Sequence, residues 1–127
     1  MTTKNLKSVL VVDDEEDVRL FLQDFLSERD MNVFAAGSGE EALEIMKRES
    51  PQVVLLDVMM PGMDGLECLE QIRRLHPKTA VIMITALNDE TRINKAKKLG
   101  AHNYILKPFS LGYLETELMN LIQDLKD

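Results

Sequence analysis

The sequence predicts an α/β protein built on a doubly wound, five-stranded parallel sheet with five helices. Three observations favour this fold class. Short aliphatic runs alternate along the chain with longer segments of helical periodicity. The runs are almost continuously apolar, as strands buried on both faces of a sheet must be. Polar side chains follow several of the runs, and the carboxyl ends of parallel strands are where open sheets bind their ligands.

The strands follow from the aliphatic runs and from the turn residues that bound them. The second strand is short and ends before Gly37-Ser38-Gly39. The expected strands cover residues 8–12, 31–36, 53–57, 80–84 and 103–106. Right-handed crossovers between them make a doubly wound sheet the simplest closure.

The first two helices have recognisable starts. Apolar residues recur at spacings of three and four over about 15–28, and Asp14 is a suitable N-cap for that helix. Ser38 or Gly39 is expected to cap the second helix, which Ser50-Pro51 ends.

The remaining helices are bounded in the same way. Asp64-Gly65 begins the third helix, and His76-Pro77 stops it. The fourth spans about 89–99 and ends at Gly100, as a C-terminal glycine would predict. The last covers roughly 110–125 and carries leucines at helical spacing.

Composition limits the possible functions. A chain of 127 residues with 45% hydrophobic content suits one globular domain over 1–127. The net charge of −7 argues against direct nucleic-acid binding. Neither a signal peptide nor a membrane-spanning segment is expected, and the single Cys68 suits a reducing cytoplasm. We expect Cys68 to be an inert thiol in the core.

Three acids are expected at the carboxyl ends of the strands. Asp13 and Asp14 follow the first aliphatic run, and Asp57 ends the third. Converging carboxylates repel one another in a partly dry site, and a divalent cation relieves that repulsion. Oxygen ligands without His or Cys favour Mg²⁺.

The other strand ends carry groups that could bind a phosphoryl group. A carboxylate such as Asp57 can act as a nucleophile and form an acyl phosphate. Lys107 would offer a positive charge to a phosphoryl oxygen, and the Thr85 hydroxyl would donate a hydrogen bond to another.

These motifs together resemble the response-regulator receiver domain, the phosphoacceptor module of bacterial two-component signalling. The likeness extends from Val9 to about Leu125. The matching pieces are Val-Val-Asp-Asp at 11–14, Leu-Leu-Asp-Val-Met-Met-Pro-Gly-Met-Asp-Gly at 55–65, Ile-Thr-Ala at 84–86 and Lys-Pro-Phe at 107–109. The resemblance implies the flavodoxin-like strand order 2-1-3-4-5.

The resemblance also implies roles for individual residues. Asp57 corresponds to the phosphorylated aspartate, and Asp13 and Asp14 to the acids that bind Mg²⁺. Met59 corresponds to the position whose backbone carbonyl ligates the metal. Lys107 corresponds to the site lysine, followed at Pro108 by a peptide bond that is usually cis.

The family's mechanism is a two-state switch. Thr85 and Tyr104 correspond to the switch hydroxyl and the switch aromatic residue. The partners implied are a sensor histidine kinase or a histidine phosphotransfer protein, together with an unknown output partner or domain. Phosphorylation would change the face formed by the fourth helix, the fifth strand and the fifth helix. Such a domain is a signalling receiver rather than an enzyme.

Two other classes can be compared with this reading. A phosphatase or phosphotransferase of the haloacid-dehalogenase type needs Asp-x-Asp, but Val58-Met59 follows Asp57. A flavodoxin-like electron carrier needs a Ser/Thr/Gly-rich phosphate loop after the first strand. Asp13-Asp14-Glu15-Glu16 stands there and would repel a flavin phosphate.

Some variable positions give further expectations. Met59 and Leu87 are apolar where polar side chains can orient water in this family, so we expect slow autodephosphorylation. Val18 or Phe21 is expected to be exposed for docking. The fourth helix is basic, through Arg92, Lys95, Lys97 and Lys98. Compensation of the helix dipole is the favoured explanation, and docking of an acidic partner is the alternative.

Overall fold

The structure is a computed structural model that describes residues 7–86 and 89–125. Its centre is a parallel sheet in the order β2-β1-β3-β4-β5. The strands are β1 (Ser8–Val12), β2 (Asn32–Ala36), β3 (Val53–Asp57), β4 (Ala80–Ala86) and β5 (Asn103–Lys107). The predicted fold class and strand order are therefore confirmed.

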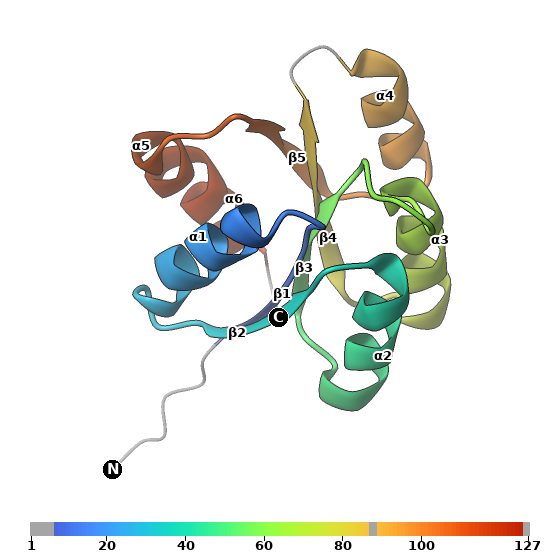
Figure 1. Cartoon of the computed structure of the whole chain (residues 1–127), viewed down its shortest axis with the longest axis horizontal. Coiled ribbons are helices and arrows are strands. Elements are labelled where there is room, and N and C mark those ends of the chain that lie inside the picture. Colours follow the sequence, from blue (N-terminus) through green and yellow to red (C-terminus); the bar gives the residue numbers. More distant parts are fainter. Residues whose placement is uncertain (1–6, 87–88, 126–127) are drawn as a thin grey trace.

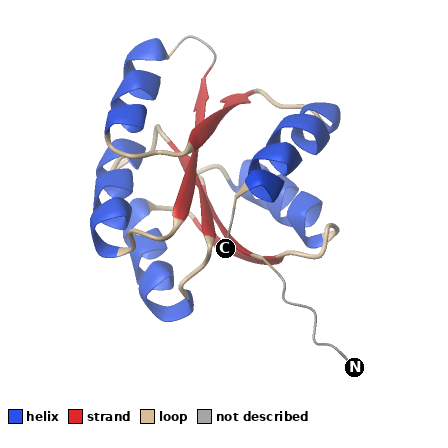
Figure 2. Cartoon of the chain, turned by 180° about the vertical axis from the view of Figure 1, so that it is seen from behind, coloured by secondary structure: helices blue, strands red, loops and turns tan. Residues whose placement is uncertain are grey.

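Helices cover both faces of this sheet (Figures 1 and 2). One face carries α2 (Gly39–Glu49), α3 (Gly65–Leu75) and α4 (Glu90–Lys98). The other carries α1 (Glu16–Ser27) and a final helix that runs through α5 (Leu111–Tyr113), η1 (Leu114–Leu118) and α6 (Met119–Asp124). No helix in the described part of the chain is both long and apolar enough to cross a membrane.

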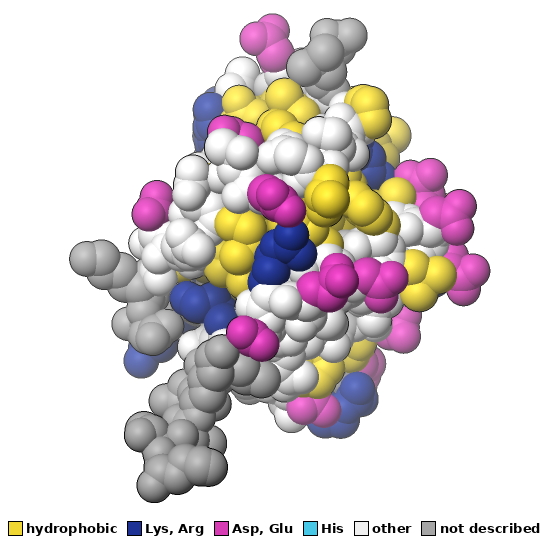
Figure 3. Space-filling model, turned by 90° about the vertical axis from the view of Figure 1, so that its left-hand side faces the viewer, with side chains coloured by type: hydrophobic (Ala, Val, Ile, Leu, Met, Phe, Trp, Pro, Cys, Tyr) yellow, Lys and Arg dark blue, Asp and Glu magenta, His cyan; other side chains and the backbone are white. Residues whose placement is uncertain are grey.

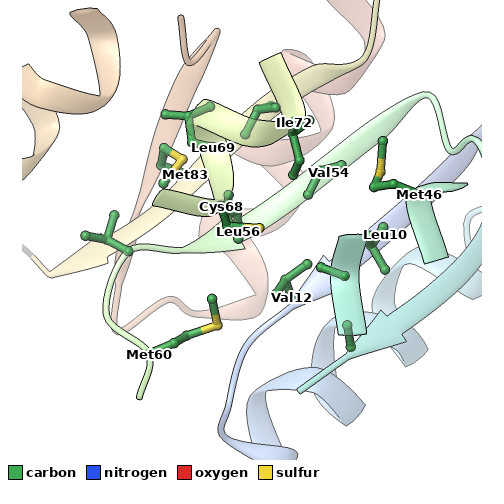
Figure 4. Close-up of a cluster of buried hydrophobic side chains, with 14 of the residues drawn as sticks. Leu10, Val12, Met46, Val54, Leu56, Met60, Cys68, Leu69, Ile72 and Met83 are labelled. Carbon is green, nitrogen blue, oxygen red and sulfur yellow. The ribbon is translucent and has the colours of Figure 1, made fainter. Parts of the chain in front are cut away.

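Each face has its own hydrophobic core. The core under α2, α3 and α4 includes Leu10, Leu56 and Met83 from the strands, as Figure 4 shows. Cys68 of α3 belongs to this core and is fully buried. The opposite core combines Leu22 and other residues of α1 with residues of the final helix. Alternate residues of every central strand thus serve opposite faces, which explains their continuous aliphatic character.

The caps agree with expectation at α2 and α3 but not at α1. The Ser38 side chain accepts the Glu41 N–H, and Asp64 accepts the Glu67 N–H. The prediction that Asp14 caps α1 was wrong, because the N-cap is Glu15 and it makes no side-chain cap bond. The Asp13 carboxylate accepts the Glu15 N–H at 2.9 Å, a local turn that precedes the extended Glu15, and the helix starts one residue later.

Two other elements differ from the prediction. Strand β4 extends through Ala86, so Thr85 lies inside it rather than after it. The final helix contains a π-helical turn over Leu114–Leu118. The Thr116 hydroxyl donates to the Gly112 carbonyl at 3.0 Å. That bond competes for a carbonyl of the regular α-helical ladder, a common cause of local irregularity. Gly100 follows the C-cap of α4 and has a positive φ of 101°, as predicted for a C-terminal glycine.

Candidate functional site

The three predicted acids meet at one edge of the sheet. Asp13 directly follows β1, Asp57 is the last residue of β3, and these two strands are neighbours. One carboxylate oxygen from each of Asp13, Asp14 and Asp57 lies within 4.8 Å of the others. The chain leaves β1 toward β2 on one side and later adds β3 on the other. The acids therefore occupy the position where doubly wound sheets form a ligand crevice.

Burial makes this cluster electrostatically unfavourable without a counter-charge. Asp13 is fully buried and Asp57 is 5% exposed, whereas Asp14 is exposed. Desolvation and the Asp13 charge raise the pKa of Asp57 to about 7, against smaller opposing effects of Lys107 and the Met59 N–H. The raised pKa means that the ionised Asp57 is unfavourable in these surroundings, so a nearby positive charge would stabilise it.

Lys107 supplies part of that charge. Its Nζ lies 2.9 Å from Asp13 Oδ2, 3.1 Å from Glu15 Oε1 and 3.5 Å from Asp57 Oδ2. Burial alone would lower the pKa of Lys107. Its hydrogen bond to Asp13 and the charge of Asp57 outweigh burial and raise that pKa. Lys107 is consequently a permanent ammonium group at physiological pH.

The cluster could hold a metal ion. Its donors are all carboxylate oxygens, and one ammonium group does not neutralise three carboxylates. Hard oxygen donors with excess negative charge suit a divalent cation such as Mg²⁺. The residues present therefore fit the metal that the sequence predicts.

Met59 and Thr85 lie next to this cluster. The Met59 N–H donates to Asp57 Oδ1 at 3.2 Å, and its side chain is 56% exposed. Asp57 pairs with Ile84 in the sheet, so Thr85 is one residue further along β4. Thr85 is almost fully buried, and its Oγ1 has no hydrogen-bond partner among the described residues. The hydroxyl is thus available for a new acceptor. Leu87 lies outside the described residues.

The remaining predicted residues belong to β5 and its end. Tyr104 is half-buried, and Lys97 Nζ lies 5.5 Å from the centre of its ring. The Lys107–Pro108 peptide bond is cis, in agreement with the resemblance. Tyr104 lies three residues before Lys107 on the same strand.

Three residues around the site were not predicted from the sequence. Glu15 pairs with Lys107, and Arg19 Nη1 donates to the Asp13 carbonyl at 2.7 Å. A Cβ on Gly65 would lie 2.1 Å from the Asp57 carbonyl oxygen, so only glycine fits there. The Asp-Gly pair at 64–65 predicts a helix start and belongs to the matched motif at 55–65, but neither pattern specifies a close backbone approach at Gly65.

Two surface expectations can be compared with the structure. Phe21 is exposed and stacks on Phe109 with ring centroids 6.1 Å apart, whereas Val18 packs against the core under α1. Leu20 is also exposed. Figure 3 shows that hydrophobic, acidic and basic side chains are interspersed on the side that carries α1 and α5.

The basic residues of α4 are near other groups of the chain. Lys95 and Lys98 line a groove with acids of α3, and Arg92 pairs with Asp89 at 3.3 Å. Lys95, Lys97 and Lys98 lie in the last turn, where cations oppose the helix dipole. Dipole compensation stays the favoured explanation, and docking of an acidic partner on α4 stays its untested alternative.

Fold and site together define a doubly wound α/β domain with an acidic, lysine-paired site at its switch point. The family model of the response regulator receiver domain matches residues 9–119. The chain belongs to this family, whose members are regulators of two-component systems rather than classical enzymes.

Individual relatives agree with this assignment. Sporulation initiation phosphotransferase F of Bacillus subtilis is 35% identical over 105 residues, which cover 83% of this chain and 85% of the relative. A protein named "Probable transcriptional regulator ycf27" from Cyanophora paradoxa is 41% identical over 119 residues, or 94% of this chain. The match covers 49% of that relative, so the chain spans about half the length of such regulators.

Solved structures agree as well. The chemotaxis protein CheY4 of Vibrio cholerae superposes with a TM-score of 0.86 at 29% identity, covering 95% of this chain and all of that protein. The response regulator domain of Thermotoga maritima CheB gives a TM-score of 0.84 at 32% identity, covering 97% of this chain and 100% of that chain.

Proposed function

We propose that residues 1–127 form a single receiver domain that accepts a phosphoryl group on Asp57. The donor is a phosphohistidine of a sensor histidine kinase or of a histidine phosphotransfer protein in the cytoplasm. The observation that carries this proposal is the convergence of Asp13, Asp14 and Asp57 at the switch point of the sheet, where Lys107 pairs with Asp13 and Asp57.

The chemistry assigned to Asp57 is nucleophilic. A carboxylate oxygen attacks phosphorus, and the bond from phosphorus to the imidazole nitrogen of the donor breaks. The electron pair stays on that nitrogen, so the donor histidine is released and Asp57 becomes an acyl phosphate. The Met59 N–H, already bonded to Asp57 Oδ1, orients the carboxylate.

The other residues hold and neutralise the phosphoryl group. Asp13, Asp14, Asp57 and the Met59 carbonyl would hold Mg²⁺, which when bound offsets the negative charge shared by Asp57 and the phosphoryl oxygens. Lys107 exchanges a carboxylate partner for a phosphoryl oxygen. The Thr85 hydroxyl, which lacks a partner among the described residues, donates to another oxygen.

The signal leaves the site through β4 and β5. Movement of Thr85 toward the phosphoryl group frees space near β4, and the half-buried Tyr104 turns into it. The face formed by α4, β5 and α5 changes shape and controls an output partner or an attached output domain. Two relatives named as probable transcriptional regulators are about twice as long as this chain. Their length supports the alternative in which the receiver controls an attached output domain.

Labelling with acetyl phosphate and Mg²⁺ tests the proposal. Intact mass should show one phosphoryl group on the wild type and none on Asp57→Asn. Asp24→Asn is the control, because Asp24 is an exposed aspartate on α1, and this variant should be labelled like the wild type. Removal of Mg²⁺ with EDTA should prevent labelling. Equal labelling of wild type and Asp57→Asn would refute the assignment of Asp57.

The rate of phosphoryl loss is a second test of the site. The exposed Met59 side chain offers no polar group to orient an attacking water. We therefore expect a phosphoryl half-life of minutes or longer, and a shorter one for Met59→Asn than for the apolar control Met59→Leu. A half-life of seconds in the wild type would contradict this expectation. Decay is measured by intact mass after removal of the phosphoryl donor.

A further inference from the structure

Arg19 reaches from α1 to the main chain of the acid pair. It is half-buried, and its Nη1 donates to the Asp13 carbonyl at 2.7 Å. Its own N–H bonds the Glu15 carbonyl in the first turn of α1. The guanidinium therefore lies against the loop that joins β1 to α1, while its backbone belongs to the helix.

The bond from Arg19 completes the restraint of Asp13. The Asp13 N–H donates to the Ala36 carbonyl at 3.1 Å, and Asp13 Oδ1 accepts the Glu15 N–H at 2.9 Å. The Asp13 carbonyl is part of the peptide group that leads to Asp14. By holding this carbonyl, Arg19 fixes the orientation of the peptide plane between the two acids.

The loop after β2 leaves room for the guanidinium. A Cβ on Gly37 would lie 3.1 Å from Arg19 Nη1 and 3.5 Å from its Cζ. The Gly37 N–H donates to Glu41 Oε1 at 2.8 Å, which holds this loop in place. An alanine at 37 would therefore press on the Arg19 guanidinium and shift it by a few tenths of an ångström.

We infer that Arg19 is a positioning residue for the metal site, acting through the Asp13 carbonyl. This inference rests on the proposed Mg²⁺ site. Two physical effects of Arg19 oppose each other. Its positive charge near the carboxylates repels a cation, so charge alone predicts tighter Mg²⁺ binding when Arg19 is removed. Its hydrogen bond orders the acid pair, so positioning predicts weaker binding on removal.

The sign of the change in Mg²⁺ affinity separates these effects. Isothermal titration of the unphosphorylated protein with MgCl₂ gives the dissociation constant without any phosphoryl transfer. We expect Arg19→Met to weaken Mg²⁺ binding about tenfold, the lower end of losses caused by removing groups that orient metal ligands. Arg19→Lys, which keeps a charged donor, should recover part of the loss.

A second variant displaces the guanidinium without deleting it. Gly37→Ala keeps every charge and should weaken Mg²⁺ binding less than Arg19→Met, but in the same direction. Gly112→Ala is its control, because a Cβ there meets nothing within 4 Å. If Arg19→Met does not fold, the comparison of Gly37→Ala with Gly112→Ala still tests the role of Arg19.

Arg29→Met is the matched control for loss of an arginine. Arg29 follows α1 and likewise donates to a main-chain carbonyl, that of Phe25, at 2.8 Å, but away from the acids. Its loss should lower the melting temperature and leave the Mg²⁺ dissociation constant unchanged. A purely structural role of Arg19 would give the same result as Arg29.

The outcomes are distinct. Unchanged or tighter Mg²⁺ binding by both Arg19→Met and Gly37→Ala, with normal wild-type binding, overturns the positioning role and leaves the proposed function intact. Failure of the wild type to bind Mg²⁺ overturns the proposed site and this inference together.

Discussion

Lys107 Nζ lies 2.9 Å from Asp13 Oδ2, although β3 and β4 separate their strands in the sheet. Asp13 is fully buried, whereas the Lys107 side chain is 22% exposed. The lysine thus extends across the ends of two strands to meet an acid that water does not reach. Without a bound metal, the Lys107 ammonium group is the main positive charge that offsets the carboxylates of the acid cluster.

Loss of Lys107 should destabilise the metal-free protein. Lys107→Met would leave the buried Asp13 and Asp57 carboxylates without their ammonium partner. We expect a decrease in unfolding free energy of about 2–3 kcal/mol, less than for a fully buried pair because Lys107 is partly hydrated. Urea denaturation in EDTA at neutral pH measures it.

A double-mutant cycle attributes this loss to the pair. In an Asp13→Asn background, Lys107→Met should cost less, because one repelling carboxylate is gone. Lys47→Met, at an exposed position in the last turn of α2, should have little effect. An equal cost of Lys107→Met in both backgrounds would contradict the coupling between Lys107 and Asp13.

Asp57 should make the stability of the metal-free protein fall as pH rises. Its pKa is raised from 3.8 to about 7 by burial and by Asp13. Between these values the folded state retains a proton that the unfolded state has released. The free energy of unfolding therefore decreases as pH rises from about 4 to about 7, and the ionised Asp57 destabilises the folded state most above pH 7. Asp57→Asn should stabilise the protein there by up to about 4 kcal/mol, and the difference should shrink toward pH 4.

Urea denaturation in EDTA across this pH range measures the difference between Asp57→Asn and the wild type. Asp24→Asn is a suitable control, since Asp24 is exposed on α1. The control should follow the wild-type profile. A wild type that is more stable than Asp57→Asn at pH 8 would show that Asp57 is not destabilised by its surroundings.

Gly65→Ala should be strongly destabilising for a steric reason. A Cβ at residue 65 would lie 2.1 Å from the Asp57 carbonyl oxygen and 2.6 Å from Val58 Cα, and these are backbone atoms that cannot rotate away. We expect a loss of about 1–3 kcal/mol or more, as for overpacked cores. Thermal denaturation measures this loss.

Gly112→Ala is the opposite case on the same molecule. Its Cβ meets nothing, so removal of glycine's backbone freedom should stabilise the protein by about 0.4–1 kcal/mol. Similar effects of the two substitutions would refute the steric explanation for Gly65.

Cys68 should be unreactive in the native protein. It is fully buried, and burial with the charges of Glu40 and Glu67 raises its pKa to about 12. The thiolate that reacts is therefore scarce at pH 8. Ellman's reagent should modify Cys68 only at the rate of unfolding, with full reaction in urea. Rapid native modification would place Cys68 at the surface.

The sequence by itself determined the fold class and most of the acid cluster at the strand ends. The alternation of aliphatic runs and helical patterns specifies a parallel sheet, because buried strands and amphipathic helices differ in their periodicity. The polar residues that end these runs then meet at one edge, as topology requires. Caps are less determined: Ser38 caps its helix, but Asp14 does not, since a turn closed by Asp13 and the Glu15 N–H precedes the helix and makes Glu15 the N-cap.

Only the tertiary structure decided which groups restrain the acids. Arg19 and Glu15 are ordinary helix-start residues in sequence. The contact of Arg19 with Asp13 depends on the direction in which α1 leaves β1, and the contact of Glu15 with Lys107 depends on how α1 and β5 pack. The role of Gly65 likewise depends on the approach of α3 to the end of β3. Local patterns report periodicity and capping, but contacts between distant segments depend on packing distances that no local pattern contains.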